Sequence, residues 1–256
     1  MENIRIKNRK NIELSIDLHI QKDSKEIVYI LHGLSGFKNQ KHIQMFKDAF
    51  LEKNIGAVLI DASNSFNESG GDYENITTTS HYNDLVDVVE WSKSQDWYKE
   101  PFYLAGHSLG GYSILKYAYD HPKQVKAMAP ISSVVSVDLL NQVLGQDTIN
   151  KWKEDGYIEE ISSSRPGIIK RRKIDFYKDG KKHNILDKAL EISTPTLLII
   201  GEKDNTVLLK HQEILLKNLS GKKELHIIPE AGHNFKSDED LKSIKSIICG
   251  WLDRIE

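Results

Sequence analysis

Short apolar runs alternate with helical patterns along most of this chain, and that alternation limits the possible folds more than any other feature. Each run ends in turn-forming residues, as strands buried on both faces of a sheet do. The runs lie at residues 27–31, 57–60, 102–105, 125–130, 196–200 and 225–228. Between them, amphipathic spacing such as that over 42–53 and 80–95 predicts helices. Strands connected by helices form right-handed crossovers, so we expect an α/β fold with a mainly parallel sheet.

The N-terminal residues follow a different pattern. Residues 4–7 and 12–20 alternate polar and apolar side chains, and the polar residues 8–11 between them favour a turn. Such alternation is typical of strands with one exposed face. We therefore expect an antiparallel hairpin at the N-terminal edge of the sheet.

The length of the chain, 256 residues, suits one domain of ordinary size with a continuous core. Residues 138–192 interrupt the alternation, because they contain no clear buried strand and are mostly polar. We interpret residues 1–256 as a single domain. Residues 138–192 are then a small, partly helical cap inserted over the carboxyl ends of the strands.

Composition excludes several classes of partner. Lys plus Arg is 35 and Asp plus Glu is 37, which gives a formal charge of −2 and no basic excess for nucleic acid. The N-terminus lacks the apolar run of a signal peptide, and no apolar stretch approaches the roughly 20 residues that cross a bilayer. We expect a cytoplasmic protein without a membrane or nucleic-acid partner. The sequence leaves the oligomeric state open, with a homodimer as one alternative.

A G-x-S-x-G sequence directly follows the apolar run at 102–105 and precedes a helical pattern; it reads Gly106-His107-Ser108-Leu109-Gly110. A serine in this setting sits on a sharp, strained turn with its hydroxyl exposed, and the glycines let the strand and helix approach each other. The alternative interpretation is a glycine-rich turn that merely contains a serine. The strand–turn–helix context favours a nucleophile.

A serine hydroxyl needs a general base near neutral pH, and the base needs an orienting carboxylate. His233 follows the last apolar run, and Asp204 follows the run at 196–200. Glu202 is a local competitor, but the shorter side chain of Asp204, further along the loop, fits this arrangement better. The resulting chain order of Ser, Asp and His is that of the α/β-hydrolase arrangement.

Acyl transfer also needs donors for the negative oxygen of the tetrahedral intermediate. The backbone N–H of Leu109 lies at the start of a predicted helix, where negative charge is favoured. The N–H of Leu34, after the first apolar run, is the second candidate. We expect His32 and His107 to support these loops.

Four segments together resemble the α/β-hydrolase superfamily: His32-Gly33, the sequence Gly106–Gly111, Gly201–Asp204 and Gly232-His233. More narrowly, they are similar to the small single-domain esterases grouped with monoglyceride lipases, cinnamoyl esterases and serine aminopeptidases. The resemblance implies the α/β-hydrolase fold, with helices on both faces of the sheet. It also implies Ser108 as nucleophile, His233 as base, Asp204 as orienting acid, and Leu34 and Leu109 as oxyanion donors. The family's Asp-x-Arg-Gly-x-Gly-x-Ser loop is absent, since residues 61–71 contain no Arg.

The cap contains candidate substrate-binding residues. Aromatic side chains at Tyr157, Phe176 and Tyr177 are candidates to line an acyl or aryl pocket, although they also suit packing within the cap. Arg171 and Arg172 lie in a basic run. Such a run is often a solvated face, and the alternative is that these arginines select esters carrying negative charge.

These features predict a serine carboxylesterase that cleaves small acyl or aryl esters through an acyl-enzyme on Ser108. Peptidase, thioesterase and acyltransferase activities use the same residues and stay open. A non-catalytic ligand-binding protein with this fold is a further alternative. No spacing of metal ligands is present, and we expect neither a metal nor a bound cofactor.

Overall fold

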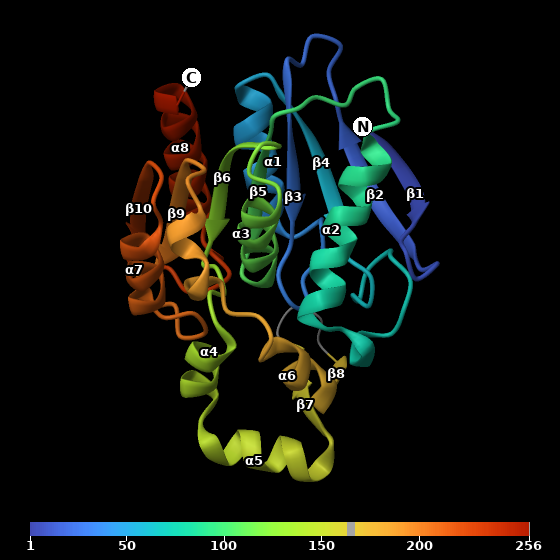
Figure 1. The fold of residues 1–256 in the computed structure, drawn as a ribbon, viewed down its shortest axis with the longest axis vertical. Coiled ribbons are helices and arrows are strands. Elements are labelled where there is room, and N and C mark those ends of the chain that lie inside the picture. Colours follow the sequence, from blue (N-terminus) through green and yellow to red (C-terminus); the bar gives the residue numbers. More distant parts are fainter. Residues whose placement is uncertain (163–166, 256) are drawn as a thin grey trace.

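An eight-stranded sheet forms the centre of the molecule (Figure 1), and its strand order is β1-β2-β4-β3-β5-β6-β9-β10. The computed structural model describes residues 1–162 and 167–255. The strands are β1 Glu2–Lys7, β2 Glu13–His19, β3 Glu26–Leu31, β4 Ile55–Asp61, β5 Phe102–His107, β6 Val125–Ile131, β9 Thr196–Gly201 and β10 Lys223–Ile228. Strand β2 pairs antiparallel with β1 and β4, and the other pairs are parallel. The predicted parallel sheet with an antiparallel N-terminal edge is confirmed.

Helices cover both faces of the sheet because its central strands are apolar on both sides. In β3, Val28 and Ile30 pack into one core, whereas Ile27, Tyr29 and Leu31 pack into the other. The first core holds α1 (Lys41–Glu52) and α8 (Asp238–Ile255). The second holds α2 (Thr78–Ser92), α3 (Leu109–Asp120) and α7 (Leu209–Asn218). Among the described residues, none of the helices combines the length and apolarity needed to span a bilayer.

The predicted cap, residues 138–192, follows β6 and precedes β9 at one end of the sheet (Figure 1). Its elements are α4 Val137–Leu144, α5 Gln146–Asp155, β7 Tyr157–Ile161, β8 Ile169–Lys173, α6 Ile174–Gly180, and the 3-10 turns η2 Ile185–Asp187 and η3 Ala189–Glu191. Strands β7 and β8 form an antiparallel hairpin separate from the main sheet. The hairpin is largely exposed, so it lacks the apolar run by which a buried strand is predicted.

A fully buried lysine, Lys38, holds the loop at residues 61–71, which lacks the arginine of the pattern described above. The ammonium of Lys38 lies 2.8 Å from Asp17 Oδ1, 3.0 Å from Glu68 Oε2 and 2.6 Å from Ser15 Oγ. Asp61 accepts hydrogen bonds from the backbone N–H groups of Lys38 and Glu68. These charge-assisted bonds attach residues 61–71 to strand β2.

We expect Gly110→Ala to lower the free energy of unfolding by about 1–3 kcal/mol, because the added carbon overpacks a site made of backbone atoms. A Cβ at Gly110 would lie 2.3 Å from the carbonyl oxygen of Leu31 and 2.5 Å from that of His32. Urea denaturation measures the effect.

Gly250→Ala is the matched control. Residue 250 lies in α8, and a Cβ there would have its nearest contact at 3.5 Å, with Arg254. We expect this change to stabilise the protein by about 0.5–1 kcal/mol through helix propensity. Equal effects of the two substitutions would contradict the tight packing at residue 110.

Candidate active site

The backbone of Ser108 has an unusual conformation at the junction of β5 and α3. Its φ is 53° and its ψ is −112°, a region in which non-glycine residues are strained. The Ser108 carbonyl accepts hydrogen bonds from the N–H groups of Tyr112 and Val134, each at 3.1 Å, and its own N–H donates to Ile131. These bonds offset the strain and hold the hydroxyl at the carboxyl end of the sheet.

Small residues around Ser108 make this sharp turn sterically feasible. A Cβ at Gly106 would lie 2.4 Å from the carbonyl oxygen of Gly110, so the strand and helix touch through their backbones. A Cβ at Gly33 would lie 2.9 Å from the Cβ of Ser108. The loop after β3 therefore lies directly against the serine.

Three side chains that are distant in the sequence form a hydrogen-bonded chain at this end of the sheet. His233 Nε2 lies 3.0 Å from Ser108 Oγ, and His233 Nδ1 lies 2.8 Å from Asp204 Oδ2. Parallel strands cause this meeting, because β5, β9 and β10 all end at the same edge. The structure thus brings together the three residues that the sequence predicts as a catalytic group.

The carboxylate of Asp204 is buried and fully engaged. Its second oxygen, Oδ1, accepts hydrogen bonds from the N–H groups of Thr206 and Val207, both at 2.9 Å. Burial raises its pKa, but the bond from His233 and these N–H groups outweigh burial, and the net pKa is lowered. Asp204 is therefore an anion that orients the imidazole. Glu202, the competitor, accepts from the backbone N–H of Glu230 instead.

Neutral histidines lie beneath His233. The His107 ring is 4.7 Å from that of His233 and 4.4 Å from that of His42, and its Nε2 bonds to the His233 carbonyl at 2.8 Å. Burial, and then neighbouring histidines, lower the pKa of both His42 and His107, that of His42 to about 3. His32 accepts from the N–H of Ala62 at 3.0 Å. His32 and His107 thus have the supporting contacts that we predicted.

The two predicted oxyanion donors flank the serine. Leu109 is the first residue of α3, and Leu34 follows Gly33 in the loop that touches Ser108. Both residues line the same cavity as Ser108. A backbone N–H at a helix N-terminus favours negative charge.

A cavity of about 410 Å³ lies between Ser108 and the cap. Its apolar wall comes largely from α4, α5 and α6, through Val137, Leu140, Val143, Leu144, Trp152, Phe176 and Tyr177. Such a volume fits a small organic molecule. Two of these lining residues, Trp152 and Tyr177, also belong to a small hydrophobic core within the cap.

The structure divides the candidate substrate-binding residues into two groups. Phe176, Tyr177 and Arg172 line the cavity with Ser108. Tyr157 and Arg171 do not: they line a separate depression on the outer side of the hairpin, where the guanidinium of Arg171 lies 3.8 Å from the Tyr157 ring centroid. Successive residues of a strand face opposite sides, so Arg171 and Arg172 cannot both face inward. We therefore drop Tyr157 and Arg171 as candidate substrate-binding residues.

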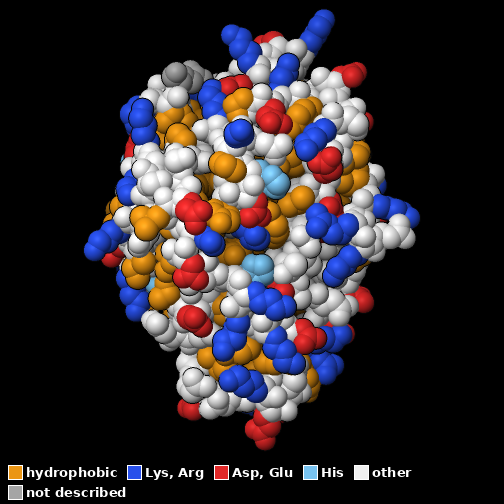
Figure 2. All heavy atoms as spheres, in the orientation of Figure 1, with side chains coloured by type: hydrophobic (Ala, Val, Ile, Leu, Met, Phe, Trp, Pro, Cys, Tyr) orange, Lys and Arg blue, Asp and Glu red, His pale blue; other side chains and the backbone are white. Residues whose placement is uncertain are grey.

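Much of the basic run is a solvated face, which was the alternative interpretation. Figure 2 shows Lys and Arg side chains gathered over the end of the molecule that carries the cap. Lys178 and Lys182 are mostly exposed there. Lys170 and Arg172 differ, because both are buried against the cavity.

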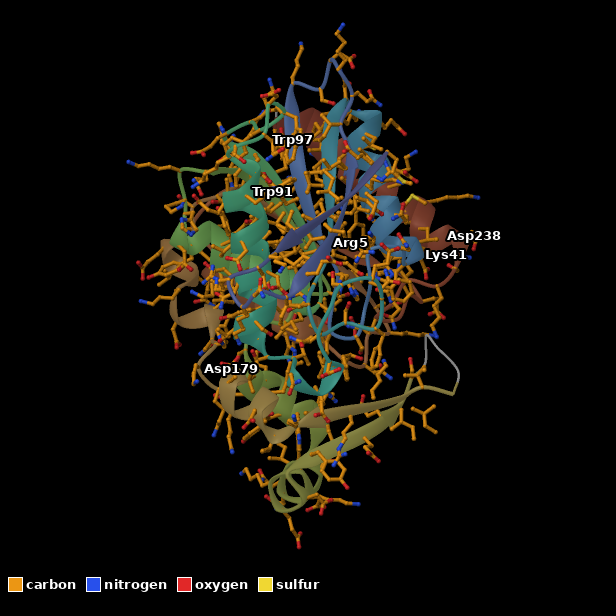
Figure 3. The ribbon with its side chains drawn as sticks, turned by 90° about the vertical axis from the view of Figure 1, so that its right-hand side faces the viewer. Arg5, Lys41, Trp91, Trp97, Asp179 and Asp238 are labelled. Atoms are coloured by element: carbon orange, nitrogen blue, oxygen red, sulfur yellow. The ribbon has the colours of Figure 1, made fainter. Side chains whose placement is uncertain are left out.

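A second polar chain, which was not predicted from the sequence, begins on the cavity wall. Tyr112 Oη lies 3.0 Å from His183 Nδ1, and His183 Nε2 lies 2.8 Å from Thr79 Oγ1. Thr79 donates in turn to Asp179, which is labelled in Figure 3 near the boundary between the cap and the rest of the molecule. The one sequence signal for these hydrogen bonds was the spacing of Asp179 and His183, which lie four residues apart.

Across residues 1–162 and 167–255, no cluster of His, Cys, Asp and Glu suits a metal ion.

Comparisons with known proteins agree with this fold. The prolyl oligopeptidase family matches residues 64–255. Monoacylglycerol lipase ABHD6 of Mus musculus is 19% identical over 88% of this chain and 75% of its own, and monoacylglycerol lipase abhd6-B of Xenopus laevis is 24% identical over 87% and 74%. Est1E from Butyrivibrio proteoclasticus, solved with ferulic acid bound, has a TM-score of 0.84 at 20% identity and covers 98% of each chain.

A mouse structure gives the same result for the fold. Alpha/beta hydrolase domain-containing protein 10 has a TM-score of 0.83 at 18% identity and covers both chains completely. The predicted α/β-hydrolase fold and the resemblance to esterases of that superfamily are thereby confirmed.

We expect acid to destabilise this site through His42. Its pKa in the folded protein is about 3, whereas an unfolded histidine titrates near 6.5, so the unfolded chain binds more protons below that pH. The stability from neutral His42 is complete above pH 6.5 and is lost as the pH falls toward 3. The expected loss from this residue between pH 6.5 and pH 5 is about 1.5 kcal/mol.

Urea denaturation of wild type and His42→Leu at several pH values measures this contribution. The variant should lose less stability than wild type between pH 6.5 and pH 5. Parallel pH dependence of the two proteins would show that His42 does not contribute in this way.

Proposed function

Because the chain belongs to the prolyl oligopeptidase family and has the α/β-hydrolase fold, we propose that it is a serine carboxylesterase that cleaves small acyl or aryl esters. The observation that carries this proposal is the hydrogen-bonded chain from Ser108 through His233 to Asp204. These hydrogen-bonded side chains start from Ser108 on a strained turn, and they face a cavity large enough for a small ester.

In the first half-reaction, Ser108 Oγ attacks the ester carbonyl carbon while its proton passes to His233 Nε2. Asp204 holds the imidazole in the tautomer that leaves Nε2 free to accept, and it stabilises the imidazolium. The backbone N–H groups of Leu34 and Leu109 bind the negative oxygen of the tetrahedral intermediate. The ester C–O bond then breaks, and His233 returns its proton to the leaving alcohol.

In the second half-reaction, a water molecule gives a proton to His233 and attacks the acyl-serine. The resulting intermediate occupies the same oxyanion site, and its collapse releases the carboxylic acid and restores the Ser108 hydroxyl. The buried, ionised Asp204 stabilises the imidazolium that forms on His233 in both half-reactions. Neither half-reaction requires a metal or a cofactor.

Ester substrates are supported by the relatives and by the cavity wall. Two relatives are monoacylglycerol lipases, and one similar structure binds ferulic acid, an aromatic carboxylic acid. Phe176 and Tyr177 offer apolar surface to an acyl or aryl group, and Arg172 offers a cation. We assign these three residues to substrate binding. A small-molecule substrate and a cytoplasmic location remain predictions from the sequence.

Peptide hydrolysis is the second candidate function, and the family match favours it. The same nucleophile, base and oxyanion donors cleave amides, with His233 protonating the leaving amine. The two functions differ in leaving group, so the substrate specificity decides between them.

We expect Ser108→Ala and His233→Ala each to lower kcat for 4-nitrophenyl butyrate by about 10⁴–10⁶-fold, with the double variant little worse, because the residues act as a unit. Asp204→Asn should cost less. Steady-state assays measure the losses, and labelling with a fluorophosphonate reports on the serine itself. A wild-type protein that neither reacts with the probe nor turns over any ester would contradict the proposal and favour a non-catalytic binding protein.

We also expect turnover of 4-nitrophenyl acetate or butyrate without cleavage of aminoacyl 4-nitroanilides. The esters have the better leaving group. Among the described residues that line the cavity, Glu160 is the one carboxylate that could bind a peptide amino terminus, and it is paired with Arg172. Parallel assays of both substrate classes on one preparation measure the preference. Faster cleavage of the anilides would show that the protein is a peptidase.

A further inference from the structure

Strand β8 presents two buried cations to the cavity and one exposed cation to the outside. Lys170 and Arg172 are 9% and 7% exposed and line the cavity with Ser108. Arg171, between them, has a side chain that is 48% exposed and stacks on Tyr157 outside the cavity. Successive residues of a strand face opposite sides, so Arg172 faces the cavity and Arg171 faces outward. The two arginines therefore form a matched pair for mutagenesis.

Positive charge exceeds negative charge on the described cavity wall. Apart from histidines, its charged side chains are Lys170, Arg172 and Glu160, which gives two cations and one anion. Glu160 is bound by the Arg172 Nη2 group and its side chain is 48% exposed. The Lys170 ammonium lies 3.0 Å from the hydroxyl of Ser35, a neutral partner. Burial, opposed by Glu160 and assisted by Arg172, lowers the pKa of Lys170.

Arg172 has a buried donor without an acceptor. Its Nε is shielded from solvent and has no hydrogen-bond partner in residues 1–162 and 167–255. Its guanidinium lies 5.4 Å from the Trp152 ring centroid and 5.6 Å from that of Phe176, so its orientation is restricted. A buried donor left unpaired costs stability, and a cationic one more so. The guanidinium therefore has hydrogen-bonding capacity beyond its bond to Glu160.

The position of these cations connects them to the reaction centre. Lys170 bonds to Ser35, which directly follows Leu34 in the loop that touches Ser108. A ligand bound by Lys170 and Arg172 therefore occupies the same cavity as an ester poised at the serine. The planar guanidinium of Arg172 matches a carboxylate better than a spherical anion.

We propose that Lys170 and Arg172 bind a carboxylate on the substrate. The preferred substrates are then esters that also carry a carboxylate. This proposal rests on the esterase function proposed above and specifies its substrate class. It keeps Arg172 from the sequence prediction and puts Lys170 in place of Arg171, because Lys170 is the neighbour that faces the cavity.

Two pairs of similarly sized substrates test the proposal. The carboxylate is on the acyl side in 4-nitrophenyl hydrogen glutarate, whose neutral partner is 4-nitrophenyl pentanoate. It is on the leaving group in 4-acetoxybenzoate, whose neutral partner is methyl 4-acetoxybenzoate. We expect wild type to have the higher kcat/KM for the anionic member of at least one pair, and that pair identifies the side of the ester that faces the cations.

Lys170→Gln and Arg172→Gln should each lower the anionic-to-neutral ratio of kcat/KM by about tenfold or more, as expected for lost charged hydrogen bonds. Arg172→Lys should restore part of the ratio, because it keeps the charge and loses the planar donor set. Arg171→Gln is the control and should leave the ratio unchanged. Ratios in the Lys170 and Arg172 variants equal to that of wild type would overturn the proposal.

An inhibition experiment on wild type does not depend on the folding of any variant. Glutarate should inhibit hydrolysis of 4-nitrophenyl pentanoate competitively, and added salt should weaken that inhibition. Hydrolysis of neutral esters with neither glutarate inhibition nor anionic preference would overturn this inference alone. The absence of hydrolysis for all four esters, together with no fluorophosphonate labelling, would overturn the esterase function itself.

Discussion

The left-handed backbone of Ser108 is the constraint on which the rest of the site depends. At φ 53° and ψ −112°, the chain leaves β5 and enters α3 within one residue, and the hydroxyl projects from the edge of the sheet. Hydrogen bonds from Tyr112 and Val134 to the Ser108 carbonyl hold this conformation. Gly106 and Gly110 allow the backbone contacts that it requires, because any side chain there would overlap a carbonyl group. A relaxed turn would withdraw the hydroxyl from His233.

The charged and neutral states of the groups around that hydroxyl follow from burial and hydrogen bonding. Asp204 stays ionised despite burial because His233 and two backbone N–H groups bind its carboxylate. His42 and His107 stay neutral because burial lowers their pKa, so they add no charge that would oppose an imidazolium on His233. The hydrogen-bonded chain lies at the edge of the sheet, and the cap places apolar surface and cations opposite it. In the function that we propose, reaction and substrate recognition therefore come from separate parts of the polypeptide.

The sheet, the hydrogen-bonded chain and the presence of a cap were predictable from the sequence, whereas the internal structure of the cap was not. Ser108, Asp204 and His233 each follow an apolar strand, and parallel topology places the ends of those strands at one edge. The hairpin β7–β8 is largely exposed, and the two β8 side chains that are buried, Lys170 and Arg172, are charged, so no apolar periodic pattern revealed it. Without its register, the sequence could not tell that Arg172 faces inward and Arg171 outward. Lys170 was missed for a similar reason, since its partner Ser35 lies 135 residues away.

Direct observation of the acyl-enzyme tests the central claim most sharply. Rapid mixing of the protein with 4-nitrophenyl butyrate, acid quenching within milliseconds and peptide mass spectrometry would locate a covalent butyryl group. The account predicts a burst of 4-nitrophenol close to one per chain and a butyryl group on the peptide that contains Ser108. Turnover of the ester with no covalent adduct, or with the acyl group on another residue, would contradict it.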